Sequence, residues 1–412
     1  MTHILTSCAL AMVFWFSTPL PAHAGSSYGS LSDEQKLVAE AWRLVDNSFL
    51  DRTFNGEDWF QLRERYVHQQ KYKTMAEAQD SIEQMVAKLG DKYTRYLSPA
   101  KYQSIVDSAT GTLAGIGVQI GTDDTGFVAV ADVEPNSPAE QAGLKVGDKF
   151  LEADGLRFDV KTTPDDVALK LRGPVGSKVG VVAERDGKTL DLILTRQPIT
   201  ITAVRSYLSN TNVPGVGKVG VIRVKNFSGT TASTVATELT DLKKKGAQAF
   251  VIDVRGNPGG LLPGGVDTAS LFLDTNKPLV FVVNKKGVVD AQSSLAAGME
   301  LDAPLVVLVD KNTASAAEVF TAALQENGRA VIAGEQTFGK GIVQTIRELS
   351  GGTNGGLAIT VARYETPQHH DINKSGIPVD VKTSVACPKD DAVACLDASA
   401  FRKAKESLQS DA

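Results

Sequence analysis

The pattern of hydrophobic positions changes twice along the chain. Between residues 32 and about 105, apolar side chains recur at helical spacing, as in SDEQKLVAEAWRLVDNSFL, which predicts a mainly helical region. From about residue 111, short β-like runs such as FVAVADV alternate with glycine turns, interrupted by one helical stretch, TPDDVALKL. From about residue 200, helical stretches alternate with four nearly continuous apolar runs: KVGVIRV, AFVIDV, PLVFVVN and PLVVLVD. Such runs predict a sheet buried on both faces, and their alternation with helices predicts an α/β core.

Aromatic side chains punctuate the helical region. The simplest role for Trp42, Phe49, Trp59 and Phe60 is packing in the hydrophobic core, and we expect all four to be buried.

The N-terminus reads as an export signal. The apolar run ILTSCALAMVFWF is too short to span a bilayer comfortably, and AHA at Ala22–Ala24 offers the small residues of a signal-peptidase site. No Lys or Arg precedes the run, which departs from the usual pattern. Despite this departure, the apolar run and the AHA triplet together predict a signal peptide at residues 1–24. In an exported protein the remaining cysteines, Cys387 and Cys395, form either a disulfide or two free thiols, and the sequence leaves both open.

Composition removes several function classes. The chain has 412 residues, enough for two or three domains, and a net charge of -5 with 22% charged residues gives no sign of a nucleic-acid surface. It contains no H-E-x-x-H motif and no paired Cys/His cluster, so we expect no metal and no cofactor.

A peptide-binding module is expected in the middle of the chain. SPAEQAGLKVGDKFLEADG, Ser137–Gly155, closely resembles the PDZ domain in the form found in bacterial proteases. Upstream, GIGV resembles the carboxylate-binding loop of that domain, which comprises Gly115, Ile116, Gly117 and Val118. Successive N–H groups of a glycine turn bind a terminal carboxylate, and the peptide backbone adds as a strand beside residues 117–120. A helix near Asp165–Leu171 is expected to form the other wall of the groove.

A serine at a strand–helix junction is the candidate nucleophile. The apolar strand Pro304–Val309 leads through a turn of small residues into a helix that begins near Ser315. A serine hydroxyl needs a base. His369 and His370 lie in a polar loop and stay open as bases, but nothing in their surroundings supports them. Lys340 stands between two glycines in GEQTFGKGIVQT, and a lysine made neutral by burial can replace histidine.

A family resemblance favours the lysine. TASAAE followed by FGKGIVQ resembles the signature of the carboxyl-terminal processing peptidases, also called tail-specific proteases, and DVRGNPGGLL and ARYETPQHHDINKSGIPVD are similar to further segments of that family. With the PDZ module, the resemblance spans nearly the whole mature chain. It implies that Ser315 is the nucleophile, Lys340 the general base and Gln344 a third catalytic residue. A regular strand would separate Lys340 from Gln344 by roughly 13 Å, so their meeting requires a bend or bulge.

The resemblance also implies an oxyanion hole and a regulatory residue. The hole would use the amide of Ala316 and one amide from Gly259 and Gly260. Chemistry favours both places, because the first amides of a helix are free and a Gly-Gly turn exposes its backbone. RGNPGGLLPGG matches neither common phosphate-binding motif, which argues against a phosphate site. Arg172, in LRGPVGS, resembles a family arginine that couples the PDZ domain to the protease core, and a solvated surface charge is the alternative.

The implied architecture is an α+β multidomain protein. It comprises an N-terminal helical region at 25–105, a PDZ β-domain at 106–200, and at 201–412 an α/β serine protease core of the crotonase/Clp-protease-like type.

Glu40–Val67 is specifically similar to the oxygenic-phototroph branch of the family. That branch includes the protease that matures the photosystem II reaction-centre (D-one) precursor. The resemblance implies a serine endopeptidase that binds a free C-terminal tail through its PDZ domain and cleaves near the C-terminus of exported proteins. Its partner would be that precursor at the membrane surface, in a thylakoid lumen or periplasm. Two alternatives remain: a non-catalytic PDZ adaptor or chaperone, and a paralogous protease with general periplasmic quality-control substrates.

Overall fold

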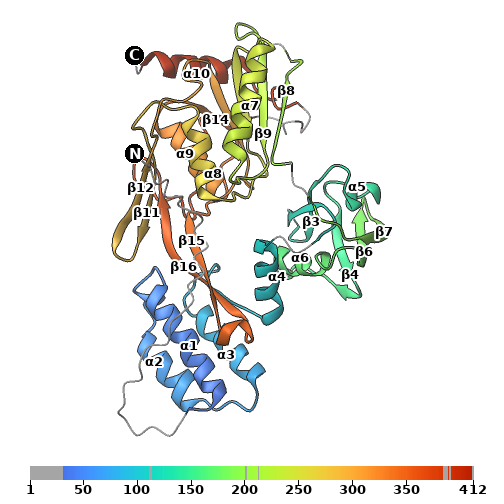
Figure 1. The fold of residues 1–412 in the computed structure, drawn as a ribbon, viewed down its shortest axis with the longest axis vertical. Coiled ribbons are helices and arrows are strands. Elements are labelled where there is room, and N and C mark those ends of the chain that lie inside the picture. The colour runs from blue at the N-terminus through green and yellow to red at the C-terminus, as the bar shows by residue number, and fades with distance from the viewer. Residues whose placement is uncertain are drawn as a thin grey trace, which may run out of the picture. The chain divides into compact units, whose positions relative to one another are not determined.

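The structure is a computed structural model that describes residues 31–110, 114–123, 125–199, 202–211, 213–383, 388 and 391–410. The predicted signal peptide lies outside these residues. The chain forms two compact units (Figure 1). The first unit combines the described residues up to Tyr96 with 203–347 and the segment from Leu357 onward, and the second combines 97–202 with 348–356.

Three helices open the first unit: α1 (Asp33–Ser48), α2 (Trp59–Arg63) and α3 (Met75–Ala87), with a 3₁₀ turn at Phe54–Gly56 and a π-helical turn at Glu64–Gln69. The side chain of Ser32 caps α1 in a capping box with Gln35, which satisfies two free donors at that end. Trp42, Phe49 and Trp59 are buried as predicted, but Phe60 is 64% exposed, so its predicted core position is wrong. Phe60 instead lies tilted against Trp42, 5.4 Å between ring centroids, because consecutive helical residues point in different directions and Trp59 takes the buried one.

A six-stranded sheet forms the centre of the first unit, in the order β17-β14-β13-β10-β9-β8. The strands are β8 (Val204–Leu208), β9 (Val219–Val224), β10 (Ala249–Asp253), β13 (Leu305–Val309), β14 (Val331–Gly334) and β17 (Val381–Lys382). All neighbours pair in parallel except β8 and β9. A mostly parallel sheet with a helical layer on each face is the predicted α/β core.

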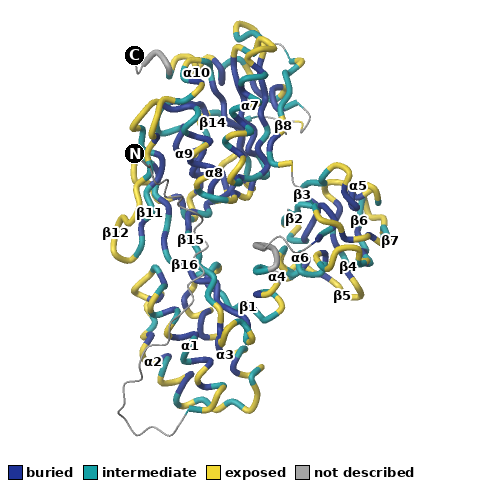
Figure 2. The backbone as a smooth tube through the Cα atoms, viewed as in Figure 1, coloured by how far each residue is buried: buried dark blue, intermediate teal, exposed yellow. Residues whose placement is uncertain are grey.

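Both faces of this sheet are covered (Figure 2). Along β13, Leu305, Val307 and Val309 pack into a core with α7 (Thr231–Lys244), α8 (Leu262–Ser270) and α9 (Ala316–Glu326). The alternate residues Val306 and Leu308 pack into a second core with α10 (Ala398–Ser410). Two buried faces explain why these strands read as continuous apolar runs.

A second sheet lies beside the first, in the order β1-β16-β11-β12, with β15 also paired to β16. Its strands are β1 (Arg95–Leu97), β11 (Pro278–Asn284), β12 (Gly287–Ser293), β15 (Ile342–Glu348) and β16 (Gly356–Glu365). A 3₁₀ turn at Ser350–Gly352 joins β15 to β16. The run PLVFVVN is β11 and was expected in the doubly buried sheet. That expectation is wrong, because β11 pairs antiparallel with β12 and β16 and is only partly buried.

The second unit is a small antiparallel sheet in the order β2-β3-β4-β6-β7, with β5 paired to β4. Its strands are β2 (Val118–Thr122), β3 (Val128–Val133), β4 (Lys149–Ala153), β5 (Leu156–Arg157), β6 (Lys178–Arg185) and β7 (Lys188–Thr195). Its helices are α4 (Pro99–Thr110), α5 (Pro138–Gln141) and α6 (Pro164–Leu171). Phe150, Leu194 and Ile116 are buried in its core.

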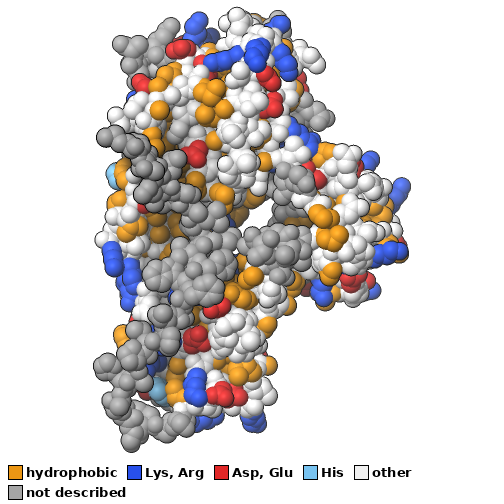
Figure 3. Space-filling model, in the orientation of Figure 1, with side chains coloured by type: hydrophobic (Ala, Val, Ile, Leu, Met, Phe, Trp, Pro, Cys, Tyr) orange, Lys and Arg blue, Asp and Glu red, His pale blue; other side chains and the backbone are white. Residues whose placement is uncertain are grey.

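The described surface carries charges of both signs. Figure 3 shows acidic and basic side chains interspersed over the visible face. No helix within the described ranges has both the length and the apolar character needed to cross a membrane.

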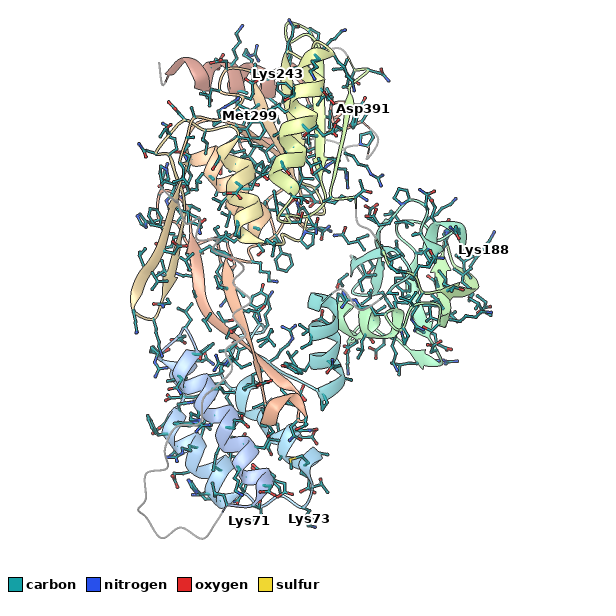
Figure 4. The ribbon with its side chains drawn as sticks, viewed as in Figure 1. Lys71, Lys73, Lys188, Lys243, Met299 and Asp391 are labelled. Carbon is teal, nitrogen blue, oxygen red and sulfur yellow. The ribbon has the colours of Figure 1, made fainter. Side chains whose placement is uncertain are left out.

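The C-terminal segment is held against the core by polar contacts. Asp391, labelled in Figure 4, accepts hydrogen bonds from Ser209 and Thr211, and the amide of Ala392 donates to the Tyr207 hydroxyl. Cys395 is disulfide-bonded. Cys387 lies outside the described residues.

Candidate active site

Ser315 occupies a strained turn between β13 and α9. Its backbone has φ 57° and ψ -122°, in the positive-φ region that non-glycine residues rarely adopt, at an order-of-magnitude cost of about 1–3 kcal/mol. The turn is held from both sides: the Thr313 hydroxyl donates to the Val254 carbonyl at 2.9 Å, and the Ala314 amide donates to the Asn257 carbonyl at 2.9 Å. The half-buried hydroxyl thus sits at the first turn of α9, as the sequence predicted.

Glu318, which the sequence analysis did not single out, joins the two candidate catalytic segments. One oxygen of its fully buried carboxylate accepts the backbone amides of Ser315 at 2.9 Å and Lys340 at 2.8 Å. The other oxygen accepts the Thr337 hydroxyl at 2.6 Å and the Gly339 amide at 2.7 Å. Burial raises the pKa of Glu318, and these four hydrogen bonds act in the opposite direction. The S-x-x-E spacing from Ser315 is a capping-box signal that could have identified it.

The loop that carries Lys340 needs its two glycines. A Cβ on Gly341 would lie 2.5 Å from the Asn373 amide nitrogen, and Gly339 has φ +82° and would place a Cβ 3.0 Å from the Lys374 carbonyl carbon. The segment around Asn373 therefore forms the backing of this loop, and the Lys374 amide donates to the Gly339 carbonyl at 2.9 Å. The glycines allow the two backbones to approach closely.

Lys340 and Gln344 both reach Tyr93. The Lys340 Nζ lies 5.9 Å from the centroid of the Tyr93 ring, and the Gln344 side-chain amide donates to the Tyr93 carbonyl at 2.7 Å. Lys340 lies outside the strand that contains Gln344, since β15 begins only at Ile342.

The sequence analysis did not identify Tyr93 as part of the site. Its hydroxyl is buried and has no hydrogen-bond partner within the described part of the chain. Burial, with the nearby charges of Glu318 and Asp91, raises the pKa of Tyr93, so the phenol stays protonated and can donate.

The predicted oxyanion donors lie against the candidate nucleophile, Ser315. A Cβ built on Gly259 would be 2.8 Å from the Ser315 Cβ and 3.0 Å from the Ala316 nitrogen. The Gly259 amide already donates to the Asn257 side chain at 2.8 Å, whereas the amides of Gly260 and Ala316 have no partner among the described residues. Of the two glycines, Gly260 therefore has the available N–H group.

Two further side chains hold this turn in place. Asn257 is fully buried and donates to the Val224 carbonyl at 2.9 Å. Asp253, at the end of β10, is buried and bonds Arg255 at 2.8 Å and Arg223 at 3.1 Å. The D-x-R-x-N segment, Asp253–Asn257, thus holds the Gly259-Gly260 turn in place.

His369 and His370 are both paired with carboxylates. His370 bonds Glu326 at 2.8 Å, and Glu326 is the last residue of the helix that Ser315 caps, about 15 Å along its axis. His369 bonds Glu365 at 3.0 Å and stacks on Phe281. Both rings are therefore engaged by partners other than Ser315.

In the second unit, the backbone N–H groups of the glycine loop, Gly115–Val118, are the feature that could bind a carboxylate. Gly117 has φ +83°, and a Cβ there would lie 2.2 Å from the Ser137 Cβ, so only glycine fits. The amide of Gly115 donates to the Gln197 carbonyl at 3.0 Å and is already used, while the amides of Ile116 and Gly117 have no partner among the described residues. Val118 begins β2 and pairs with Val133. Arg172 is exposed and directly follows α6.

A strained serine at a helix N-terminus, with free N–H groups beside it and a lysine loop fastened to it, is the arrangement of a serine peptidase. A family model for peptidase family S41 matches residues 218–383, and one for the PDZ domain matches residues 129–185. The chain belongs to the S41 family of carboxyl-terminal processing proteases. The predicted family and the predicted combination of helical region, PDZ domain and protease core are confirmed.

Relatives are similar over most of their length. The carboxyl-terminal-processing protease of Synechocystis sp. is 42% identical over 85% of this chain and 81% of its own. The chloroplastic C-terminal processing peptidase of Tetradesmus obliquus is 39% identical over 88% of this chain and 79% of its own. Among solved structures, a photosystem II D1 C-terminal processing protease matches with a TM-score of 0.73 at 36% identity, covering 90% of this chain and all of that one.

Proposed function

We propose that this C-terminal processing serine protease uses Ser315 as its nucleophile and Lys340 as its general base, and that its substrate is the photosystem II D1 precursor. The observation that carries the dyad is the Glu318 carboxylate, because a single oxygen binds the backbone amides of both residues. A carboxylate in that position fixes the two loops relative to each other.

The reaction proceeds by acyl transfer. Neutral Lys340 takes the proton from the Ser315 hydroxyl as the oxygen attacks the scissile carbonyl carbon. The resulting oxyanion receives hydrogen bonds from the amides of Ala316 and Gly260. Lys340 then returns the proton to the leaving amine, which frees the C-terminal fragment. Water, deprotonated by Lys340, hydrolyses the ester and restores the serine.

Gln344 acts as an orienting residue in this proposal. Its amide donates to the Tyr93 carbonyl, and the Tyr93 ring lies beside the Lys340 Nζ, so Gln344 positions Lys340 through Tyr93.

Substrate selection falls to the PDZ unit. The amides of Ile116 and Gly117 bind the terminal carboxylate, and the tail adds beside β2. Arg172, which follows the groove helix α6, couples tail binding to cleavage. Arg172→Ala should therefore lower the cleavage rate of a tailed protein more than it lowers tail affinity.

The choice of the D1 precursor rests on likeness to proteins from oxygenic phototrophs and to a protease that is named for processing photosystem II D1. It implies a site of action in a thylakoid lumen or periplasm after removal of residues 1–24. Purified enzyme should be incubated with a peptide copying the D1 precursor tail, and the cut located by mass spectrometry. A matched peptide of the same composition in scrambled order tests selectivity. Equal cleavage of both would favour a general quality-control protease, and no cleavage of either would favour a tail-binding adaptor.

A further inference from the structure

β15 has an unused edge next to the candidate base. The strand pairs with β16 on one side, and no strand in the described ranges pairs with its other side (Figure 1). It begins at Ile342, two residues after Lys340. Ile342 is buried and Val343 to Ile346 are half-buried, and β15 contains neither the proline nor the lysine that commonly protects an exposed edge.

The hydrogen bonds of the β15–β16 hairpin show which backbone groups point to the unused edge. The Gly341 carbonyl accepts the Tyr364 amide at 2.8 Å, and the Leu349 amide donates to the Gly355 carbonyl at 2.9 Å. Both residues on the β15 side are odd-numbered, and strand backbones alternate direction at every residue. The odd-numbered residues therefore face β16, and Ile342, Gln344 and Ile346 direct their N–H and C=O groups outward.

The partner strand absorbs an irregularity that would otherwise break this alternation. The two hydrogen bonds just described are eight residues apart on the β15 side and nine residues apart on the β16 side. The extra residue of a β-bulge therefore lies in β16. Thr360 agrees, since its carbonyl accepts the Leu50 amide and its amide donates to the Thr94 hydroxyl, on the side away from β15.

We propose that the outer edge of β15 binds the substrate backbone beside the scissile bond as an added strand. The inference rests on the proposed function, and its occupant is an extended segment of the polypeptide being cut. Three outward residues each offer one donor and one acceptor over about 13 Å, enough for several backbone hydrogen bonds. The strand leads directly away from the Lys340 loop, so an added chain would arrive at the candidate dyad.

The first test uses the enzyme unchanged. A cleaved peptide with a free carboxylate is N-methylated at one backbone nitrogen at a time, at positions two or more residues from the scissile bond. An added strand predicts alternation: on one side of the bond, every second methylation lowers kcat/KM by about fivefold or more, and its neighbours have little effect. A uniform effect, or none, over four successive positions on both sides would overturn the proposal.

The second test changes the strand. Ile346→Pro removes an outward N–H group and should raise KM, while Ile346→Ala removes the side chain and keeps the N–H group. The proposal expects Ile346→Ala to bind substrate clearly better than Ile346→Pro at equal melting temperature; equal KM values in two folded variants would contradict it. If Ile346→Pro does not fold, the methylation series decides.

These outcomes differ from failure of the proposed function. If the dyad assignment is wrong, Ser315→Ala or Lys340→Ala still cleaves the unmodified peptide. If only the strand inference is wrong, both variants are inactive, the wild type cleaves, and the methylation series shows no alternation.

Discussion

Glu318 holds the active-site geometry more directly than any residue the sequence singled out there. Four donors converge on its buried carboxylate, two from the lysine loop, one from the nucleophile and one from Thr337. The sequence offers Ser315 and Lys340 as candidates because they lie in segments that resemble a family signature, and their roles stay predictions. Glu318 is indicated only by its S-x-x-E spacing from Ser315, and the contacts of Asn257 and Tyr93 could not be predicted, because their partners lie in segments that only the fold brings together.

Replacing the Glu318 carboxylate tests this geometry. Glu318→Gln presents an NH₂ group to donors that need an acceptor, so at least two hydrogen bonds to a charged group are lost, each worth about 1.5–3 kcal/mol. We expect kcat to fall by at least about tenfold, with a lower melting temperature. Glu326→Gln, at the other end of the same helix, is the control and should retain wild-type turnover.

The same side chain gives stability a defined pH dependence. Because burial raises the pKa of folded Glu318 above its unfolded value, the folded state binds the proton more tightly. The contribution of this group to stability is present below the unfolded pKa and is lost as pH rises through the folded pKa. Urea unfolding should therefore show the stability of wild type relative to Glu318→Gln declining from pH 4.5 to pH 8. A difference that grows with pH would contradict the raised pKa.

The identity of the base is a second question at this scale. Lys340→Ala should be inactive, and Lys340→Arg should fail too, since guanidinium stays protonated at any working pH. His369→Ala and His370→Ala should keep most activity, because their rings are paired with the carboxylates of Glu365 and Glu326. Peptide cleavage assays on the four folded variants decide, and inactive histidine variants beside an active Lys340→Ala would reverse the assignment.

At the scale of elements, the sequence identified what is local. Helix α9, groove helix α6 and the apolar strand β13 lie where capping residues and periodicity predict them. The assignment of β11 failed because an apolar run specifies burial and leaves its pairing partner open. That partner, β16, lies about 80 residues further along the chain.

The groove helix α6 depends on one buried arginine. Arg196 donates to the carbonyls of Lys170 at 2.7 Å and Leu171 at 3.0 Å, which are free acceptors at the end of the helix. Arg196→Met should destabilise the PDZ unit by at least about 2 kcal/mol and weaken tail binding, because buried acceptors lose their donors. Urea unfolding and calorimetric titration with a tail peptide measure both effects.

The exposed Arg157 offers the matched control. Its side chain is 90% exposed and pairs loosely with Glu152 at 3.6 Å. Arg157→Met should change stability by less than about 0.5 kcal/mol, as expected for a surface ion pair. Similar losses in both variants would mean that Arg196 has no special role.

At the scale of the whole molecule, the PDZ domain and most of the peptidase domain fall in separate compact units. Amidating the C-terminus of a substrate removes the charge that the Ile116 and Gly117 amides would bind. We expect KM to rise by roughly tenfold or more, since a hydrogen bond to a charged group is worth about 1.5–3 kcal/mol. Steady-state kinetics on paired acid and amide peptides measure this.

Gly117→Ala provides the internal comparison. A methyl group there would collide with Ser137, so the loop must shift and the variant should distinguish acid from amide poorly. Equal cleavage of both peptides by wild type would remove carboxylate recognition as the basis of selection.

The first unit is built from segments far apart in the chain, and this determines when the candidate active site can assemble. Tyr93 bonds Gln344 across 251 positions, and Asp91 bonds Thr360 across 269. Contacts of such long sequence separation form late and slowly. A nascent chain that ends soon after Ser315 still lacks β15 and β16, the strands that hold Gln344 and Thr360. The candidate active site can therefore assemble only after the C-terminal part of the chain has been made, so the order of synthesis itself delays its completion.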